Sequence, residues 1–304
     1  MISIVIATFN RCESLRETLE SLCAQDFKSL GEEVEIVVIN NNSTDRTAEV
    51  IAETAKKAPC EMRGIFEPRQ GISAARNRGI SESRGEFLFF TDDDVIVQPG
   101  WIHAYQQAFR ESGADCAGGK IVPLWGKKPE PWMLSPELIP IINGSFALLD
   151  HGPAPFILKE LNLNFFYGAN MAFRKAAFGE LGGFREDRGM VGNKRLYGED
   201  TDMIFKFFNA GKKMVYAPSA VVHHKVPAFR MTLSYVRKWR FDKALDSPPV
   251  GFEKTLPPFW LFKECVSNGG SALMTYCQGK QIAGIAKELQ FWTQLGQIAG
   301  LLRR

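Results

Sequence analysis

The chain has 304 residues, of which 45% are hydrophobic, and its 37 Lys and Arg against 34 Asp and Glu give a net charge of +3. This length can bury a large core, and the hydrophobic fraction argues for a globular α/β protein rather than a disordered one. Six scattered cysteines lack the Cys-x-x-Cys spacing of a zinc site or a redox pair, which predicts reduced thiols in a cytoplasm.

The two ends of the sequence bear on localisation. Residues 1–6 form a strand-length apolar run without a basic leader or a cleavage site, so we expect no signal peptide. The uncharged stretch 265–279 is too short and too polar to span a membrane. We therefore predict a cytoplasmic protein, soluble or peripheral at the inner face of the cell membrane.

Charge is distributed unevenly along the chain. Residues 225–304 hold 12 Lys and Arg against 5 Asp and Glu, a net charge of +7, which leaves −4 for residues 1–224. A basic tail favours an anionic partner, either a membrane surface or a phosphate-bearing acceptor. An ordinary solvated basic surface is the alternative.

Strand-like and helix-like segments alternate through the first third of the chain, which predicts βαβ units and a mostly parallel central sheet. The expected strands cover residues 3–8, 34–39, 62–66 and 87–92. The expected helices lie around residues 15–22, between the polar turn at 40–45 and residue 51, and around residues 74–83. Ligands bind such a sheet beyond the carboxyl ends of its strands. Thr8, Asn40 and Asp92 all fall at those ends.

The middle of the chain is less regular. Residues 119–165, which include Trp125, form either a substrate-facing insertion or loops packed on the core. An ordered block resumes at 166–174, and the Gly-rich polar loop 188–198 has the composition of a lid. Glu199 and Asp200 then open another helix.

The tail contains apolar residues at helical spacing. Ile282, Ile285, Leu289 and Trp292 recur at three- or four-residue steps, which predicts an amphipathic helix. Packing on the rest of the protein, formation of a homodimer and contact with a membrane can all use such a face.

Three consecutive carboxylates, Asp92, Asp93 and Asp94, follow the apolar run 87–90. Like charges at the mouth of a buried strand repel one another and resist desolvation, so a positive group is expected there. Oxygen ligands favour a hard cation such as Mg²⁺ or Mn²⁺, with room for substrate phosphates. Capping of a helix that begins near Pro99 is the alternative.

Eight short motifs occur in an order typical of one family, each at the end of a strand or helix. They are residues 4–11, 41–45, 71–77, 92–94, 168–174, 182–184, 198–200 and 222–224. Over roughly residues 1–240, the sequence resembles family 2 glycosyltransferases with the GT-A fold. The resemblance implies an α/β/α sandwich with a nucleotide-binding half, 1–118, and an acceptor-binding half, 119–240, followed by a helical extension, 241–304.

The resemblance also implies which residues bind the nucleotide-sugar donor: Thr8, Asn10, Arg11, Asn40, Asn41, Arg76, Asp92 and Asp93. Asp92 and Asp94 match the acidic positions of the family's Asp-x-Asp motif, the second on the metal, Mn²⁺ or Mg²⁺. His224 matches a family histidine beyond the last strand that contacts the metal or the diphosphate. A structural histidine is the alternative.

Asn40 departs from the family pattern, in which Asp is common and accepts a hydrogen bond from N3–H of uracil. A neutral amide can accept through its oxygen or donate through its nitrogen. A UDP-sugar is the favoured donor on family grounds, with guanosine and thymidine donors open.

The implied chemistry is a single inverting displacement. A metal on Asp94 stabilises the departing diphosphate as a Lewis acid. Asp200 is the candidate general base for the acceptor hydroxyl. Trp125 and Glu199, the neighbour of Asp200, are predicted to lie on the acceptor side or in the lid. First-turn acids that stabilise a helix are the alternative for Glu199 and Asp200. The implied acceptor is a glycan or a lipid-linked saccharide of a bacterial surface polysaccharide.

Two other classes of function compete. A glycoside hydrolase also uses paired carboxylates, but it needs a water between them and no nucleotide pocket. A non-catalytic nucleotide-sugar-binding protein would tolerate loss of Asp200. The sequence contains no Walker-type phosphate loop and no nucleic-acid-binding module, so P-loop phosphoryl transfer and sequence-specific DNA binding are not expected.

Overall fold

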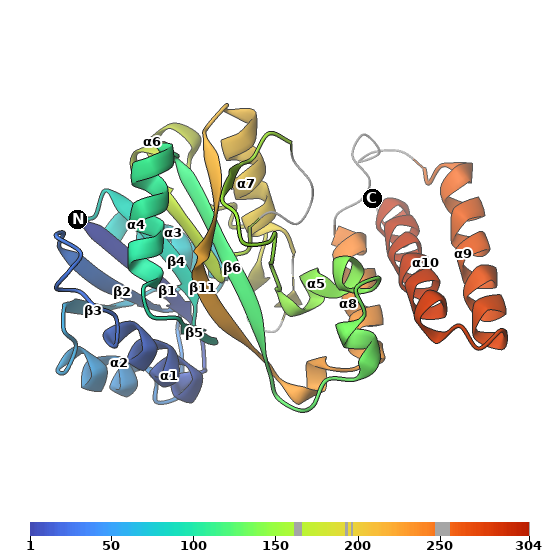
Figure 1. Cartoon of the computed structure of the whole chain (residues 1–304), viewed down its shortest axis with the longest axis horizontal. Coiled ribbons are helices and arrows are strands. Elements are labelled where there is room, and N and C mark those ends of the chain that lie inside the picture. The colour runs from blue at the N-terminus through green and yellow to red at the C-terminus, as the bar shows by residue number, and fades with distance from the viewer. Residues whose placement is uncertain (161–165, 192–193, 196, 247–255, 304) are drawn as a thin grey trace. The chain divides into compact units, whose positions relative to one another are not determined.

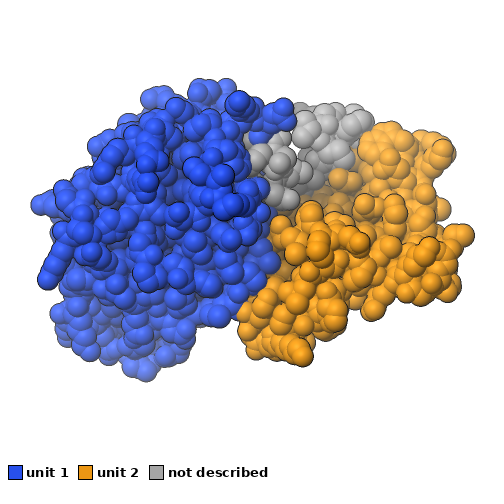
Figure 2. Space-filling view, in the orientation of Figure 1, with its two compact units in different colours: residues 1–124, 147–194, 198–225 blue, residues 125–146, 195–197, 226–304 orange. Residues whose placement is uncertain are grey.

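The computed structural model describes residues 1–160, 166–191, 194–195, 197–246 and 256–303. The chain forms two compact units, coloured in Figure 2. The first contains residues 1–124, 147–194 and 198–225, and the second contains residues 125–146, 195–197 and 226–304. The predicted boundary at residue 240 falls inside helix α8, Leu233–Asp246. Local periodicity carries no information on the long-range contacts that group 125–146 with the C-terminal helices.

The first unit is built on a nine-stranded sheet with the order β3-β2-β1-β4-β8-β6-β11-β5, and β7 pairs with β11 (Figure 1). The strands are β1 Ile2–Thr8, β2 Val34–Asn40, β3 Glu61–Phe66, β4 Phe87–Asp92, β5 Val95–Val97, β6 Cys116–Trp125, β7 Phe156–Ile157, β8 Asn170–Arg174 and β11 Met214–Val226. Two short strands, β9 Met190–Val191 and β10 Lys194–Arg195, pair separately.

The sheet is mixed rather than parallel throughout. The first four strands pair in parallel, β3 with β2, β2 with β1, and β1 with β4. Beyond β4 the pairs are antiparallel, as between β4 and β8, β8 and β6, and β11 and β5. The α/β prediction is confirmed. The parallel part of the sheet is the region where helices α1 Cys12–Cys23, α2 Thr47–Ala55 and α3 Ile72–Glu82 connect successive strands.

Burial explains why these segments fold in this way. All seven residues of β2 are buried, as expected for a strand covered on both faces. Helix α1 turns Leu15, Leu19 and Leu22 to the core at helical spacing. Helices α4 Trp101–Ser112, α6 Ala176–Leu181 and α7 Glu199–Asn209 complete the unit.

The second unit is helical. It contains η1 Pro131–Leu134, α5 Ile139–Phe146, η2 Ala228–Arg230, α8, α9 Phe259–Cys277 and α10 Gln281–Leu302. The predicted amphipathic tail helix is confirmed as α10, which packs against both α8 and α9. A Cβ on Gly296 would lie 2.3 Å from the carbonyl oxygen of Phe241, so glycine permits the close approach of α10 to α8. Across the described residues, no helix combines the length and apolar character needed to cross a bilayer.

Candidate active site

The site is organised by strands that end together. Thr8 pairs with Asn40 and Ala7 pairs with Asp92, so the carboxyl ends of β1, β2 and β4 lie side by side. The sequence prediction that Thr8, Asn40 and Asp92 close these strands is confirmed. The loops that follow the strands therefore converge on one edge of the sheet.

The loops after β1 and β2 are hydrogen-bonded to each other. The backbone N–H of Thr44 donates to Asn10 Oδ1 at 2.7 Å, and the N–H of Asn10 donates to Ser43 Oγ at 3.0 Å. Asn10 has a φ of 52° and Asn42 a φ of 61°, a left-handed conformation that asparagine adopts more readily than most residues. The side-chain oxygen of Asn10 thus positions the loop.

Asn40 and Asn41 use their amides differently. Asn41 is fully engaged within the protein, since it donates to the carbonyls of Glu67 and Arg69 and accepts from the N–H of Gly71 at 2.8 Å. Asn40 Oδ1 accepts the N–H of Ser43 at 2.9 Å. The Asn40 side chain thus retains its Nδ2 donor and a second lone pair on Oδ1.

Arg11 binds two of the three consecutive aspartates. Its Nη1 lies 2.9 Å from Asp93 Oδ1 and 2.9 Å from Asp94 Oδ2. The charge of Asp93 raises the pKa of Arg11, while burial opposes that rise. Burial raises the pKa of Asp93 to about 6, against the lowering effect of Arg11. The positive group expected beside the aspartates is thus present in the chain itself.

Asp94 and His224 fit a divalent metal ion. His224 lies within β11, opposite Val95, rather than beyond the last strand, because that strand runs on to Val226. Its Nε2 is 3.5 Å from Asp94 Oδ1, close to the separation of about 3 Å between two ligands that share a small divalent cation at about 2.1 Å. Nδ1 of His224 is buried and has no hydrogen-bond partner among the described residues.

The protein supplies few ligands of this kind. Within the described part of the chain, no three His, Cys, Asp or Glu side chains gather in a metal-binding arrangement. A magnesium-type ion commonly takes one or two protein ligands and completes its shell with water and substrate phosphates. The pair Asp94 and His224 is therefore compatible with an ion that binds together with a diphosphate.

Arg76 connects the acidic strand end to α7. Its guanidinium, only 4% exposed, lies 3.1 Å from Asp92 Oδ1 and 3.1 Å from Glu199 Oε1. A Cβ on Gly168 would approach Arg76 Nη2 to 2.0 Å, so this site needs glycine. Burial, followed by the charge of Asp200, raises the pKa of Glu199 to about 7 even though Arg76 opposes the rise.

Asp200 occupies the first turn of α7. Gly198, with a φ of 97°, precedes the helix, and such a value favours glycine. The N–H of Thr201 donates to Asp200 Oδ1 at 2.7 Å, and the N–H of Gly168 donates to Oδ2 at 3.3 Å. Neutral donors hold the Asp200 carboxylate, whereas an arginine binds the carboxylate of Glu199.

Two asparagines support the site in ways that sequence reasoning missed, although both lie in motifs that it singled out. Asn77 donates to the carbonyl of Phe184 and accepts its N–H at 2.7 Å, which ties α3 to the segment before α7. Asn170 is fully buried and accepts from Trp101 Nε1 at 2.8 Å and from the hydroxyl of Tyr105 at 2.7 Å. The available signal was the position of each asparagine inside a motif, 71–77 for Asn77 and 168–174 for Asn170.

The predicted acceptor-side residues are only partly described. Trp125 ends β6 and belongs to the second unit, where its ring packs edge-on against Phe146 at 5.5 Å. In the predicted lid, 188–198, residues 192, 193 and 196 lie outside the described residues.

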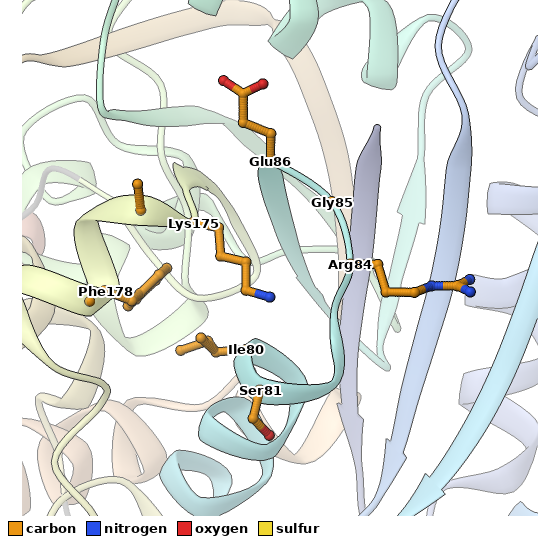
Figure 3. A pocket seen from close by; sticks show the side chains of 9 residues that line it. Ile80, Ser81, Arg84, Gly85, Glu86, Lys175 and Phe178 are labelled. Atoms are coloured by element: carbon orange, nitrogen blue, oxygen red, sulfur yellow. The ribbon is translucent and has the colours of Figure 1, made fainter.

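A cavity of about 680 Å³ lies at the opposite, amino end of β4. Figure 3 shows Lys175 and Phe178 on one side of it and Ile80 and Ser81 on the other. Its charged groups already have partners, since Lys175 donates to the carbonyl of Ser83 and Arg84 binds the buried carboxylate of Glu35. The strand-end cluster is the better candidate for chemistry.

Solved structures share this architecture. The chain resembles the mannosyltransferase PcManGT from Pyrobaculum calidifontis, solved in complex with GDP-Man and Mn²⁺, with a TM-score of 0.57 and 17% identity over 99% of this chain and 74% of that one. At this identity the likeness shows the fold alone, and that fold is the GT-A fold of glycosyltransferases.

Sequence comparison then gives the family. The family described as Glycosyl transferase family 2 matches residues 3–182, more than half of the chain. The chain is 30% identical to the Succinoglycan biosynthesis protein ExoM of Rhizobium meliloti (strain 1021), over 79% of this chain and 72% of the relative. It is 27% identical to the Glucosyl-dolichyl phosphate glucuronosyltransferase of Haloferax volcanii, over 77% and 72%. The chain belongs to glycosyltransferase family 2 and is a glycosyltransferase.

Proposed function

We propose that this glycosyltransferase is metal-dependent and inverting, and that it moves a sugar from a UDP-sugar to a hydroxyl of a glycan or a lipid-linked saccharide. The observation that carries the proposal is that Asp94 lies beside His224 directly after β4, while Arg76 joins Asp92 at the end of β4 to Glu199, the neighbour of Asp200. A nucleotide, a metal and a base would then meet on the same edge of the sheet.

Asp200 is the proposed general base. Its carboxylate accepts hydrogen bonds from the backbone N–H groups of Gly168 and Thr201 and a long one from the Thr201 hydroxyl, all neutral donors, and a further lone pair can accept the proton of an acceptor hydroxyl. Glu199 is the poorer candidate because Arg76 already binds it. One displacement at the anomeric carbon inverts its configuration.

Asp94 and His224 are the proposed ligands of Mn²⁺ or Mg²⁺. The ion, when bound, neutralises the charge that develops on the leaving diphosphate. Arg11 binds Asp93 and Asp94 together and orients the carboxylate of Asp94. Manganese is favoured because the structurally similar mannosyltransferase was solved with Mn²⁺.

Asn40 is proposed to contact the base of the donor. Asn40 Oδ1 already accepts the N–H of Ser43, and we propose that the amide nitrogen is the group that contacts the ligand. A donor of this kind suits a carbonyl oxygen, such as O4 of uracil or O6 of guanine, and cannot accept from N3–H. Thr8, at the end of β1, is proposed to face the nucleotide as well, while Asn10 and Asn41 shape the loops around it.

The acceptor is proposed from the relatives. One is named for succinoglycan biosynthesis and another for transfer to a dolichyl phosphate saccharide, so a polysaccharide or a lipid-linked saccharide is the acceptor class. A cytoplasmic site at the inner face of the membrane, with the basic C-terminal helices in contact with it, suits a lipid-linked acceptor. Formation of a homodimer is the competing use of these helices.

The test is a transfer assay with UDP-, GDP- and dTDP-sugars, Mn²⁺ and saccharide acceptors, in which NMR reports the anomeric configuration of the product. Inverted product from one donor class, reduced about a thousandfold by Asp200→Asn, is expected. Retained configuration, or an active Asp200→Asn enzyme, would contradict the mechanism. Metal-independent cleavage of a simple glycoside would indicate a hydrolase, and donor binding without turnover would indicate a sensor.

A further inference from the structure

Helix α9 exposes an unusual number of apolar side chains. Phe259 is 82% exposed, Val266 75% and Leu273 67%. Of the fifteen large hydrophobic side chains that are exposed in the described residues, seven lie between positions 256 and 274. Scattered single residues of this kind are normal, but such a concentration marks an interaction surface.

These side chains lie on one side of the helix. Phe259, Phe262, Val266 and Leu273 follow one another at three-, four- and seven-residue steps, which places them on a common face. Met274 and Lys263 lie beside them. We call these six residues the α9 face.

The α9 face is distinct from the side of the helix that packs in the protein. Leu261 and Cys265 are buried in a cluster with Ile298 and Leu301 of α10. Figure 1 shows α9 and α10 side by side, and their packing accounts for the buried side of α9. The exposed side is therefore additional to what the helical hairpin needs for its own core.

The balance of charge on the hairpin favours an anionic partner. Lys263, Lys280 and Lys287 are exposed, and none forms an ion pair with any residue that the structure describes. Of the two acids of the hairpin, Glu288 is paired with an arginine, whereas Glu264 accepts a hydrogen bond from neutral Gln294 and keeps its charge against the three lysines. The lysines thus dominate the field that this surface presents.

We propose that the α9 face docks on an anionic membrane surface, with α9 lying in the plane of the interface. Its apolar side chains would enter the boundary between headgroups and acyl chains, and the lysines would bind lipid phosphates. Lys263, within the face, can extend its amine to the headgroups while its stem stays apolar. The proposal deepens the proposed function, because a lipid-linked acceptor is presented at such a surface.

A second copy of the chain is the less suitable occupant. It would cover the apolar residues, but it would also bring Lys263 and the other basic groups of a tail with a net charge of +7 close to their own counterparts. Like charges brought together in this way oppose association. An anionic surface satisfies both the apolar and the basic groups.

The experiment is cosedimentation of the full chain with vesicles of phosphatidylglycerol and phosphatidylcholine, or of phosphatidylcholine alone. The variant is Leu273→Asp, and its matched control is Leu134→Asp, which adds the same charge at a leucine that is 54% exposed in η1 of the same unit. We expect binding to the anionic vesicles only, weakened by salt. Leu273→Asp should reduce it about tenfold or more, and Leu134→Asp should leave it unchanged.

Two outcomes would overturn the proposal. Equal or absent binding to both kinds of vesicle would remove the membrane as partner, and a dimer in analytical ultracentrifugation that Leu273→Asp dissociates would assign the face to a second copy. Thermal stabilisation of the same Leu273→Asp protein by nucleotide is measured in parallel. It distinguishes failure of the membrane proposal from failure of the proposed function. Vesicle binding without any nucleotide binding would leave the α9 face standing and overturn the transferase mechanism.

Discussion

Arg76 and Glu199 form a buried ion pair, 3.1 Å long, between α3 and the first residue of α7. The same guanidinium binds Asp92 at the end of β4, so one side chain joins the strand end to the residue beside Asp200. The predicted contact between Arg76 and the nucleotide stays a prediction. The geometry gives Arg76 a positioning role as well, because it holds two carboxylates in fixed relation.

We predict that Arg76→Lys lowers kcat about tenfold and the free energy of unfolding by roughly 3 kcal/mol. A lysine amine is a single point and cannot replace the two bonds of the guanidinium fork. The matched control is Arg78→Lys on the same helix, where the arginine is half exposed and pairs with Glu82 at the surface. Steady-state kinetics and urea unfolding check both. Equal effects of the two variants would remove the positioning role of Arg76.

The pKa of Glu199 predicts a specific dependence of stability on pH. Its folded-state pKa of about 7 exceeds the ordinary 4.5, so between these values the folded protein binds more protons than the unfolded one. Stability attributable to Glu199 is therefore lost as pH rises from about 4.5 to 7, by about 3 kcal/mol. Glu199→Gln should lack this loss in urea unfolding at pH 5 and pH 8. The prediction fails if the variant and the native protein change in parallel.

The pKa of Glu35 predicts the opposite dependence of stability on pH. Glu35 is fully buried, and although burial alone would raise its pKa, hydrogen bonds from Ser3, from the N–H of Arg84 and from Arg63 lower it to about 2. This stability is present above pH 4.5 and is lost as pH falls towards 2, by about 3 kcal/mol. Glu35→Gln should be destabilised by this order at pH 7 and should show a flatter acid limb. An acid limb unchanged from that of the native protein would contradict the prediction.

Metal binding can be tested with adjacent histidines. Asp94→Ala should abolish Mn²⁺ binding in the presence of nucleotide, as followed by electron paramagnetic resonance, and His224→Ala should weaken it about tenfold or more. The control is His223→Ala, since successive side chains of β11 point to opposite faces of the sheet. Equal losses for the two histidine variants would mean that His224 is not a ligand.

The sequence predicted those parts of the fold that depend on local pattern. Continuous apolar runs gave β1, β2 and β4, and the polar residues that follow them mark the site, because strand ends and chemistry coincide along the sequence. The bond between Arg76 and Glu199 spans 123 positions and has no local signature. For the same reason no local pattern indicates that Asn41 hydrogen-bonds residues 67–71 after β3, or that β4 pairs in antiparallel fashion with β8.

Helix α9 shows a second limit. Residues 265–277 lie in the helical extension, 241–304, that the resemblance implies, but Gly269 and Gly270 and the small polar residues around them weaken the helical pattern of the segment itself. Packing against α10 compensates for that weak propensity, and such tertiary stabilisation cannot be predicted from one segment alone.

Thermal unfolding of the native chain with UDP, GDP, dTDP and ADP, each with and without Mn²⁺, tests the central claim most directly. A ligand at a hundred times its dissociation constant stabilises the folded state by about 2.7 kcal/mol, which raises the melting temperature by several degrees. We predict a rise with one nucleotide, UDP first, that requires Mn²⁺. No rise with any nucleotide, or an equal rise without metal, would contradict a metal-dependent nucleotide-sugar site at the ends of β1, β2 and β4.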